Sequence, residues 1–145
     1  MRTPFATLFF ASFALAACNA TGGKRVFNPA GRQDDIPYSH AVQVGETLYV
    51  AGTLGIDPAT GAIPASVRDE VRFAMDGIAA KLALAGMTMD DVVSVQVFCS
   101  DVTLYGTFNE VYRTYFEGDY PARAFVGSGP LLRGARFEIC ATAVR

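Results

Sequence analysis

The chain has 145 residues, of which 51% are hydrophobic, and 12 Lys and Arg against 14 Asp and Glu give a formal net charge of −2. This length suits a single domain, and the scattered basic residues form no concentrated positive stretch of the kind that binds nucleic acid. Because His40 is the only histidine and no CxxC or HExxH spacing occurs, a His-based catalytic triad and a multi-His metal site within one chain are excluded.

The first 17 residues are typical of a secretory signal peptide. Arg2 is the only charge before Lys24, and the apolar run at 5–17 is shorter than the roughly 20 residues of a membrane span. The run ends Leu15-Ala16-Ala17-Cys18, which resembles a bacterial lipobox. We therefore expect cleavage before Cys18, lipidation of that cysteine, a tether at 18–23, and a periplasmic protein anchored by lipid to the membrane, the outer one in a Gram-negative cell. A plain signal peptide, or a misplaced start codon before a cytosolic protein, is the alternative.

The remaining residues, 24–145, are expected to form one α+β domain. Period-two alternation predicts strands, and apolar residues three to four apart predict helices. The order is three strands, a helix, a strand, a helix and two strands. The expected ranges are 24–27, 41–44 and 47–54 for the strands, a helix of about 20 residues from Ser66 to Gly86, a strand at 92–99, a helix at about 103–116, and strands at 122–126 and 135–144.

The outer faces of these strands are unusually poor in charge. Two helices cannot cover both sides of a sheet this wide, and a solvated sheet face is expected to be polar. On the second faces we expect Tyr49, Ala51 and Thr53, then Ser94, Gln96 and Phe98, then Glu138, Cys140 and Thr142, with Val93, Val95 and Val97 facing the helices. The pattern predicts that the second face packs against another subunit.

Three further groups stand out by their chemistry. Cys99 and Cys140 fit either buried thiols or a disulfide, which an oxidising periplasm permits. Arg123 is the only charge between Tyr120 and Leu132, and Glu138 lies in an alternating strand. A guanidinium binds a ligand carboxylate bidentately, and a carboxylate can move a proton or orient water. The two favour a small pocket for a carboxylate-bearing substrate, and the alternative is an ordinary ion pair between neighbouring strands.

Six segments, in this order and spacing, are similar to the RidA/YjgF family of reactive-intermediate deaminases. They are IPYSHAV (36–42), LYVAGT (48–53), GIDPATG (55–61), FNEVY (108–112), YPARA (120–124) and FEICATA (137–143). The resemblance implies a two-layer fold like that of trimeric chorismate mutase, with three subunits forming a barrel and sites at their interfaces. It also implies hydrolysis of 2-imino acids and their enamines to 2-keto acids and ammonia, without metal or organic cofactor.

The resemblance also implies roles for individual residues. Arg123 matches the arginine that holds the substrate carboxylate, and Glu138 matches the glutamate that holds the attacking water. Tyr38 matches a tyrosine that closes the pocket, Gly52 a glycine where the backbone approaches the ligand, and Asn109 an asparagine near the cleft. For these last three, a core aromatic, a strand bulge and a backbone tie are the structural alternatives.

Departures from the family pattern put the substrate in doubt. Ala51 stands where many members have a serine, Thr53 replaces a common glutamine, and Phe125 fills a position that is often small or a cysteine. Two other functions stay open: a non-catalytic trimer that binds small carboxylates, and a protein-interaction role at the cell envelope. Endoribonuclease activity, a label sometimes given to the family, is disfavoured by the charge distribution.

Overall fold

The computed structural model describes residues 23–32 and 35–145. The expected signal peptide, residues 1–17, and the expected lipidation site, Cys18, lie outside these residues. Among the residues described, no helix has the length and apolar character needed to cross a membrane.

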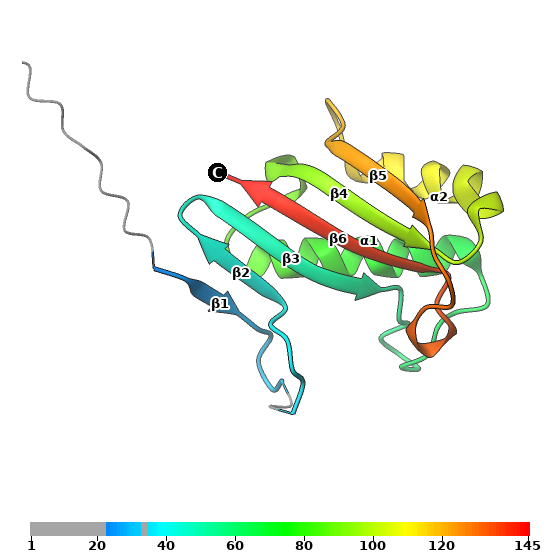
Figure 1. The fold of residues 1–145 in the computed structure, drawn as a ribbon, viewed down its shortest axis with the longest axis horizontal. Helices are drawn as coiled ribbons and strands as arrows, with labels where there is room; N and C mark the ends of the chain where they lie inside the picture. Colours follow the sequence, from blue (N-terminus) through cyan, green and yellow to red (C-terminus); the bar gives the residue numbers. More distant parts are fainter. Residues whose placement is uncertain (1–22, 33–34) are drawn as a thin grey trace, which may run out of the picture.

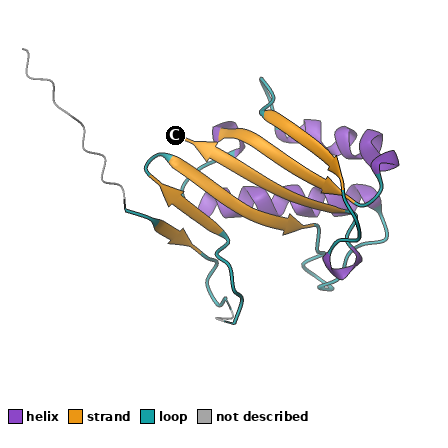
Figure 2. Ribbon diagram, viewed as in Figure 1, coloured by secondary structure: helices purple, strands orange, loops and turns teal. Residues whose placement is uncertain are grey.

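Within residues 23–32 and 35–145, six strands form one sheet, and two helices cover one of its faces (Figure 1). The strands are β1 (Arg25–Phe27), β2 (Ala41–Val44), β3 (Thr47–Leu54), β4 (Val92–Cys99), β5 (Ala122–Gly127) and β6 (Phe137–Val144), and the helices are α1 (Val67–Leu84) and α2 (Tyr105–Tyr112). The order across the sheet is β1-β2-β3-β6-β4-β5. Among the described strands only β4 and β5 pair in parallel, because α2 carries the chain back between them. The predicted α+β class and order of elements are confirmed, and Figure 2 shows the opposite sheet face without a helix.

Local signals explain the ends of α1. The Ser66 hydroxyl accepts a hydrogen bond from the Asp69 N–H at 3.3 Å, as an N-cap does. At the other end Gly86 has φ 71°, and the N–H groups of Gly86 and Met87 donate to Ala83 and Leu82, a Schellman ending. The second predicted helix is shorter than expected, because α2 is flanked by 3-10 turns at Val102–Leu104 and Arg113–Tyr115.

The core lies between the helices and the covered sheet face. The structure confirms the predicted alternation of buried and exposed residues in β6. Its buried residues are Phe137, Ile139, Ala141 and Ala143, and the residues between them face the open side. Cys99 pairs with Phe137 on the covered face, whereas Cys140 pairs with Gln96 on the open face. Both are free thiols, and the disulfide alternative is wrong because the two side chains lie on opposite faces. Burial raises the pKa of each thiol.

Two β-bulges in the described sheet change which face some strand residues occupy. Val92 pairs with Ala143 and Ser94 with Thr142, so Val93 is an extra residue and is 46% exposed rather than facing the helices. Along β3, Val50 pairs with Ala141 and Thr53 with Ile139, so Ala51 and Gly52 together oppose Cys140. The extra residue turns Thr53 to the covered face, where it is buried, and its predicted place on the open face is wrong. The bulge alternative for Gly52 is confirmed.

A buried carboxylate ties α1 to the start of β6. Glu70 is fully buried, and its Oε1 accepts from the N–H groups of Arg136 and Phe137 at 2.6 and 3.1 Å. Its other oxygen pairs with the Arg136 guanidinium. Gly55 lets the helix approach, since a Cβ there would lie 2.7 Å from Glu70 Cγ. Glu70 therefore anchors the strand that carries Glu138.

Replacing Glu70 by alanine is expected to lower the free energy of unfolding by about 3–5 kcal/mol, because it leaves a partly buried guanidinium and two amides without their acceptor. Denaturant unfolding measures this loss. Glu70→Gln, which keeps the size and one carbonyl acceptor, is the matched control and should lose less. A loss below about 1 kcal/mol for the alanine variant, the level of an exposed ion pair, would contradict the anchoring role.

Candidate active site

Arg123 lies on β5 among aromatic side chains of α2. Its guanidinium donates to Asn109 Oδ1 at 2.8 Å and to the Tyr105 hydroxyl at 3.4 Å, and it lies 4.4 Å from the centre of the Tyr112 ring. Among the described residues no carboxylate pairs with it. The guanidinium is thus oriented by an amide and by ring faces, and its charge is left available for an anion.

A cavity of about 520 Å³ opens beside this arginine. Its lining consists of Asn109, Tyr112, Arg113, Tyr120, Pro121 and Arg123. Burial raises the pKa of Tyr112, and within the described chain its buried hydroxyl has no hydrogen-bond partner. The Asn109 side chain, and then the charge of Arg123, lower the pKa of Tyr105. We call Arg123, Asn109, Tyr105, Tyr112 and Phe125 the arginine cluster.

Phe125 belongs to the wall of this cluster. Its ring packs edge-on against Tyr105 at 5.0 Å and against Phe108 at 5.2 Å. Phe125 therefore packs against the aromatic side chains that surround Arg123, whose guanidinium lies 6.0 Å from the Phe125 ring.

Glu138 lies on the open face of β6, beside the β3 bulge. Gly52 leaves room for it, because a Cβ at position 52 would lie 3.0 Å from Glu138 Cδ and nearer still to its Oε1. The Ala51 N–H donates to the His40 carbonyl at 3.0 Å, and the ring of Tyr38 lies 5.7 Å from that of His40. Tyr38 is linked to Ala51 only through His40, so we call Glu138, Gly52 and Ala51 the glutamate cluster.

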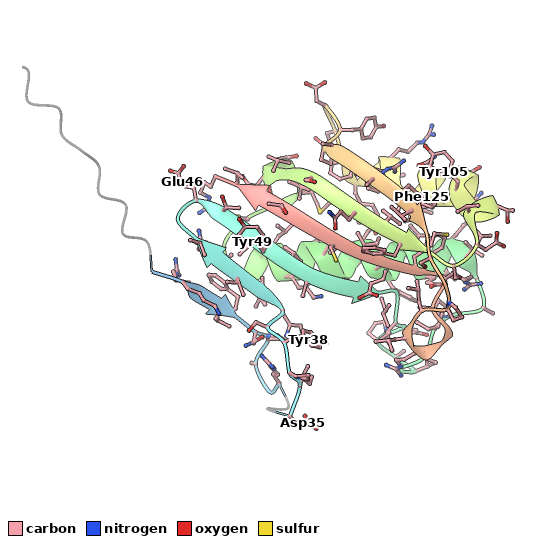
Figure 3. All side chains as sticks on the ribbon, viewed as in Figure 1. Asp35, Tyr38, Glu46, Tyr49, Tyr105 and Phe125 are labelled. Atoms are coloured by element: carbon pink, nitrogen blue, oxygen red, sulfur yellow. The ribbon has the colours of Figure 1, made fainter. Side chains whose placement is uncertain are left out.

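The two clusters lie apart in a single chain. Arg123 pairs with Val95, which is buried under the helices, whereas Glu138 pairs with Phe98, an odd number of residues along the same strand. Residues paired across strands share a face and successive residues alternate, so Arg123 and Glu138 lie on opposite faces. Because β4 also separates β5 from β6, the alternative of an ordinary ion pair between neighbouring strands is wrong. Figure 3 shows Tyr38 and the pair Tyr105–Phe125 near opposite edges of the sheet.

Sequence reasoning missed Lys81 of α1. Its Nζ lies on the covered side of the bulge and donates to the carbonyls of Ala51 and Gly52 at 3.2 Å each and to Thr53 Oγ1 at 2.6 Å. The available signal was a lysine three residues after the buried Ile78, on the apolar side of the helix. Across the part of the chain that the structure describes, no three His, Cys, Asp or Glu side chains gather closely enough to hold a metal ion.

Comparison with known proteins places the chain in a family. The model of the family described as Endoribonuclease L-PSP matches residues 33–145. The chain belongs to this family. A 2-iminobutanoate/2-iminopropanoate deaminase of Mus musculus is 43% identical over 110 residues, which cover 75% of this chain and 82% of the relative. The Homo sapiens protein of the same name is 36% identical over 110 residues, covering 75% and 80%.

Solved structures of Endoribonuclease L-PSP relatives share the fold. Escherichia coli TdcF with bound serine matches with a TM-score of 0.77 and 31% identity, over 83% of this chain and 98% of that one. RidA from the Antarctic bacterium Psychrobacter matches with a TM-score of 0.77 and 30% identity, over 83% and 99%. The RidA/YjgF resemblance predicted from the six segments is confirmed.

Proposed function

We propose that the protein is an imine deaminase that hydrolyses 2-imino acids, and the enamines in equilibrium with them, to 2-keto acids and ammonia. The observation that carries the proposal is Arg123, an oriented guanidinium without a carboxylate partner in the described chain, at the edge of a cavity large enough for a small amino-acid derivative. Relatives named for this activity, of which the chain covers 80% or more, support the same reaction.

The reaction needs orientation and one proton relay. Arg123 binds the substrate carboxylate, and Asn109 and Tyr105 hold the plane of the guanidinium. Glu138 accepts a proton from water as the oxygen adds to the imine carbon, which forms a carbinolamine. The same carboxylic acid gives this proton to the nitrogen and completes the carbinolamine. It then takes the proton of the carbinolamine hydroxyl and passes it to the nitrogen as the C–N bond breaks, so ammonia leaves and the carbon becomes the carbonyl of the keto acid.

Because Arg123 and Glu138 lie on opposite faces of one chain, their joint action requires a second copy. We propose a homotrimer in which the open sheet faces pack inward and each site combines the arginine cluster of one copy with the glutamate cluster of the next. The open face suits burial: Tyr49 is 55% exposed, and a shallow depression of about 340 Å³ has uncharged side chains around it. Tyr49, Ser94, Gln96, Cys140 and Thr142 are among them.

The proposed activity is tested by supplying 2-iminopropanoate, generated in place from alanine by an amino-acid oxidase, and measuring the release of keto acid and ammonia. Catalytic amounts of the protein should accelerate this release above the spontaneous rate. No acceleration, combined with binding of pyruvate that depends on Arg123, would instead support the non-catalytic carboxylate-binding trimer. If neither the reaction nor pyruvate binding depends on Arg123, the result would support the protein-interaction role at the cell envelope.

Gly52→Ala tests whether activity depends on the position of the Glu138 carboxylate, because the variant keeps Glu138 but displaces its side chain. The added methyl group overlaps the carboxylate of Glu138, so the acid must turn away from the bulge. A misplacement on the order of 1 Å costs about a hundredfold in rate, and we expect kcat to fall by that factor. The control is Gly106→Ala in α2, where a new Cβ meets no atom within 4 Å. Equal kcat for Gly52→Ala and wild type would mean that Gly52 does not shape the site.

We also propose that the chain is exported and lipidated on Cys18. The support is the sequence alone: Arg2, the apolar run at 5–17 and the Leu15–Cys18 motif. Metabolic labelling with a fatty-acid analogue should mark the wild type in the membrane fraction and leave Cys18→Ser unlabelled. Equal labelling of both, or a wild-type protein confined to the cytosol, would overturn this proposal.

A further inference from the structure

Lys81 is a partly buried cation that the proposed reaction does not use. Its three ammonium protons have three acceptors, namely the carbonyls of Ala51 and Gly52 and the hydroxyl of Thr53. The Thr53 hydroxyl in turn donates to the Ala51 carbonyl at 3.0 Å. The ammonium is therefore fixed under the bulge by a closed set of hydrogen bonds.

The close packing of α1 on β3 makes these contacts. Gly77 lies one turn before Lys81 on the same side of the helix, and a Cβ there would lie 2.7 Å from Thr53 Cγ2. Without a side chain at position 77, the helix can approach β3 closely enough for Lys81 to reach the backbone. The arrangement depends on both the missing side chain of Gly77 and the bulge that turns Thr53 toward the helix.

The effect of this cation passes through the bulge to the other face of the sheet. The described chain has no cis peptide bond, so the N–H of each peptide points away from its carbonyl oxygen. When Lys81 binds the oxygens of Ala51 and Gly52, the N–H groups of Gly52 and Thr53 point away from Lys81. A charged donor on a carbonyl polarises that peptide and makes its N–H a stronger donor.

We propose that Lys81 is a positioning residue of the glutamate cluster, which holds the bulge in the shape that accommodates Glu138 and strengthens the Gly52 and Thr53 amides as donors. Its catalytic consequence rests on the proposed deaminase function, whereas its effect on the bulge does not. Lys81 touches no substrate; it acts through the backbone of Ala51 and Gly52.

The surroundings of Lys81 determine when it carries its charge. Burial lowers the pKa of Lys81 to about 8, against the opposing effects of Cys140 and Glu138 on β6. His40, before β2, faces the same region, and its pKa is lowered by burial and then by Lys81. On β3, the groups next to the Lys81 ammonium are the two carbonyls and the hydroxyl described above. On α2, Glu110 pairs with Arg68, which lies about 20 Å from Lys81 along α1, so it does not face Lys81. The bulge thus loses its cation as the pH rises through about 8.

The amide nitrogens of Gly52 and Thr53 report this change without any assay of activity. Their nuclear magnetic resonance shifts, followed from about pH 6.5 to about pH 9.5, should titrate with a midpoint near 8 in the wild type. In Lys81→Met the titration should disappear. Lys81→Gln, which retains amide donors without the charge, is a second variant and should also show none. A wild type without the transition, or variants that keep it, would overturn the proposal.

Kinetics test the consequence for the reaction. At neutral pH we expect kcat/KM of Lys81→Met to be about tenfold below the wild type, the effect of losing a charge-assisted hydrogen bond. The wild type should lose activity as the pH rises through about 8, and the variant should lack this alkaline fall. Arg68→Ala, which removes an exposed cation of the same helix far from the bulge, should keep the fall. An unchanged pH profile in Lys81→Met would refute the positioning role, whereas a wild type inactive at every pH would refute only the deaminase function.

Discussion

Arg123→Ala is expected to lower kcat/KM for imine hydrolysis about a thousandfold. The guanidinium is the cation oriented by Asn109 and Tyr105, and removing one partner of a hydrogen-bonded charge pair costs several kcal/mol of binding in the transition state. Arg123→Lys should recover only a part, because an ammonium lacks the planar fork that binds a carboxylate. Initial rates at several substrate concentrations measure both effects.

Arg68→Ala is the matched control for the loss of a guanidinium. Arg68 forms an exposed ion pair with Glu110, and such pairs contribute little to stability. Its kcat/KM should stay close to that of the wild type. If Arg123→Ala stays within a factor of about two of the wild type while the protein remains folded, Arg123 does not bind the substrate carboxylate.

Subunits that lack Arg123 and subunits that lack Glu138 should restore activity when they assemble together. Each variant alone, Arg123→Ala or Glu138→Ala, is expected to be almost inactive. In a trimer that contains both variants, one interface in three combines an intact glutamate cluster with an intact arginine cluster, so about a third of the wild-type activity should return. Co-expression with two different affinity tags allows the mixed trimers to be isolated and assayed.

The same two variants, purified separately and combined without exchange of subunits, provide the control and should stay inactive. Isolated mixed oligomers that show no activity would contradict a site divided between copies. Recovery would establish that one site combines the arginine cluster of one copy with the glutamate cluster of another, since neither cluster alone contains both groups.

Local patterns were enough to predict most elements. The alternation of Phe137, Ile139, Ala141 and Ala143 defines β6, since side chains alternate along any strand. Ser66 and Gly86 mark the ends of α1 because a side-chain acceptor and a positive φ are needed there regardless of the rest of the fold. These requirements act over a few residues, so the sequence shows them directly.

The bulges could not be read in this way. An extra residue in a strand becomes visible only when the strand is paired with its neighbour, and it then shifts the alternation of side chains on one side of the bulge. Val93 and Thr53 therefore face the opposite side from the one that simple alternation predicts. The contact of Lys81 with the bulge depends on the same strand register, so the sequence alone did not predict it.

For the candidate site, the sequence by itself singled out Arg123 and Glu138, because isolated charges in strands must be paired or used. It also indicated an uncharged second sheet face and, by resemblance, the family. Only the tertiary structure decided that the two charges lie on opposite faces, that Asn109 and the aromatic rings orient Arg123, and that Lys81 supports the bulge beside Glu138. Charge and periodicity are properties of the local sequence, whereas the face on which a strand residue lies depends on pairing with residues far along the chain.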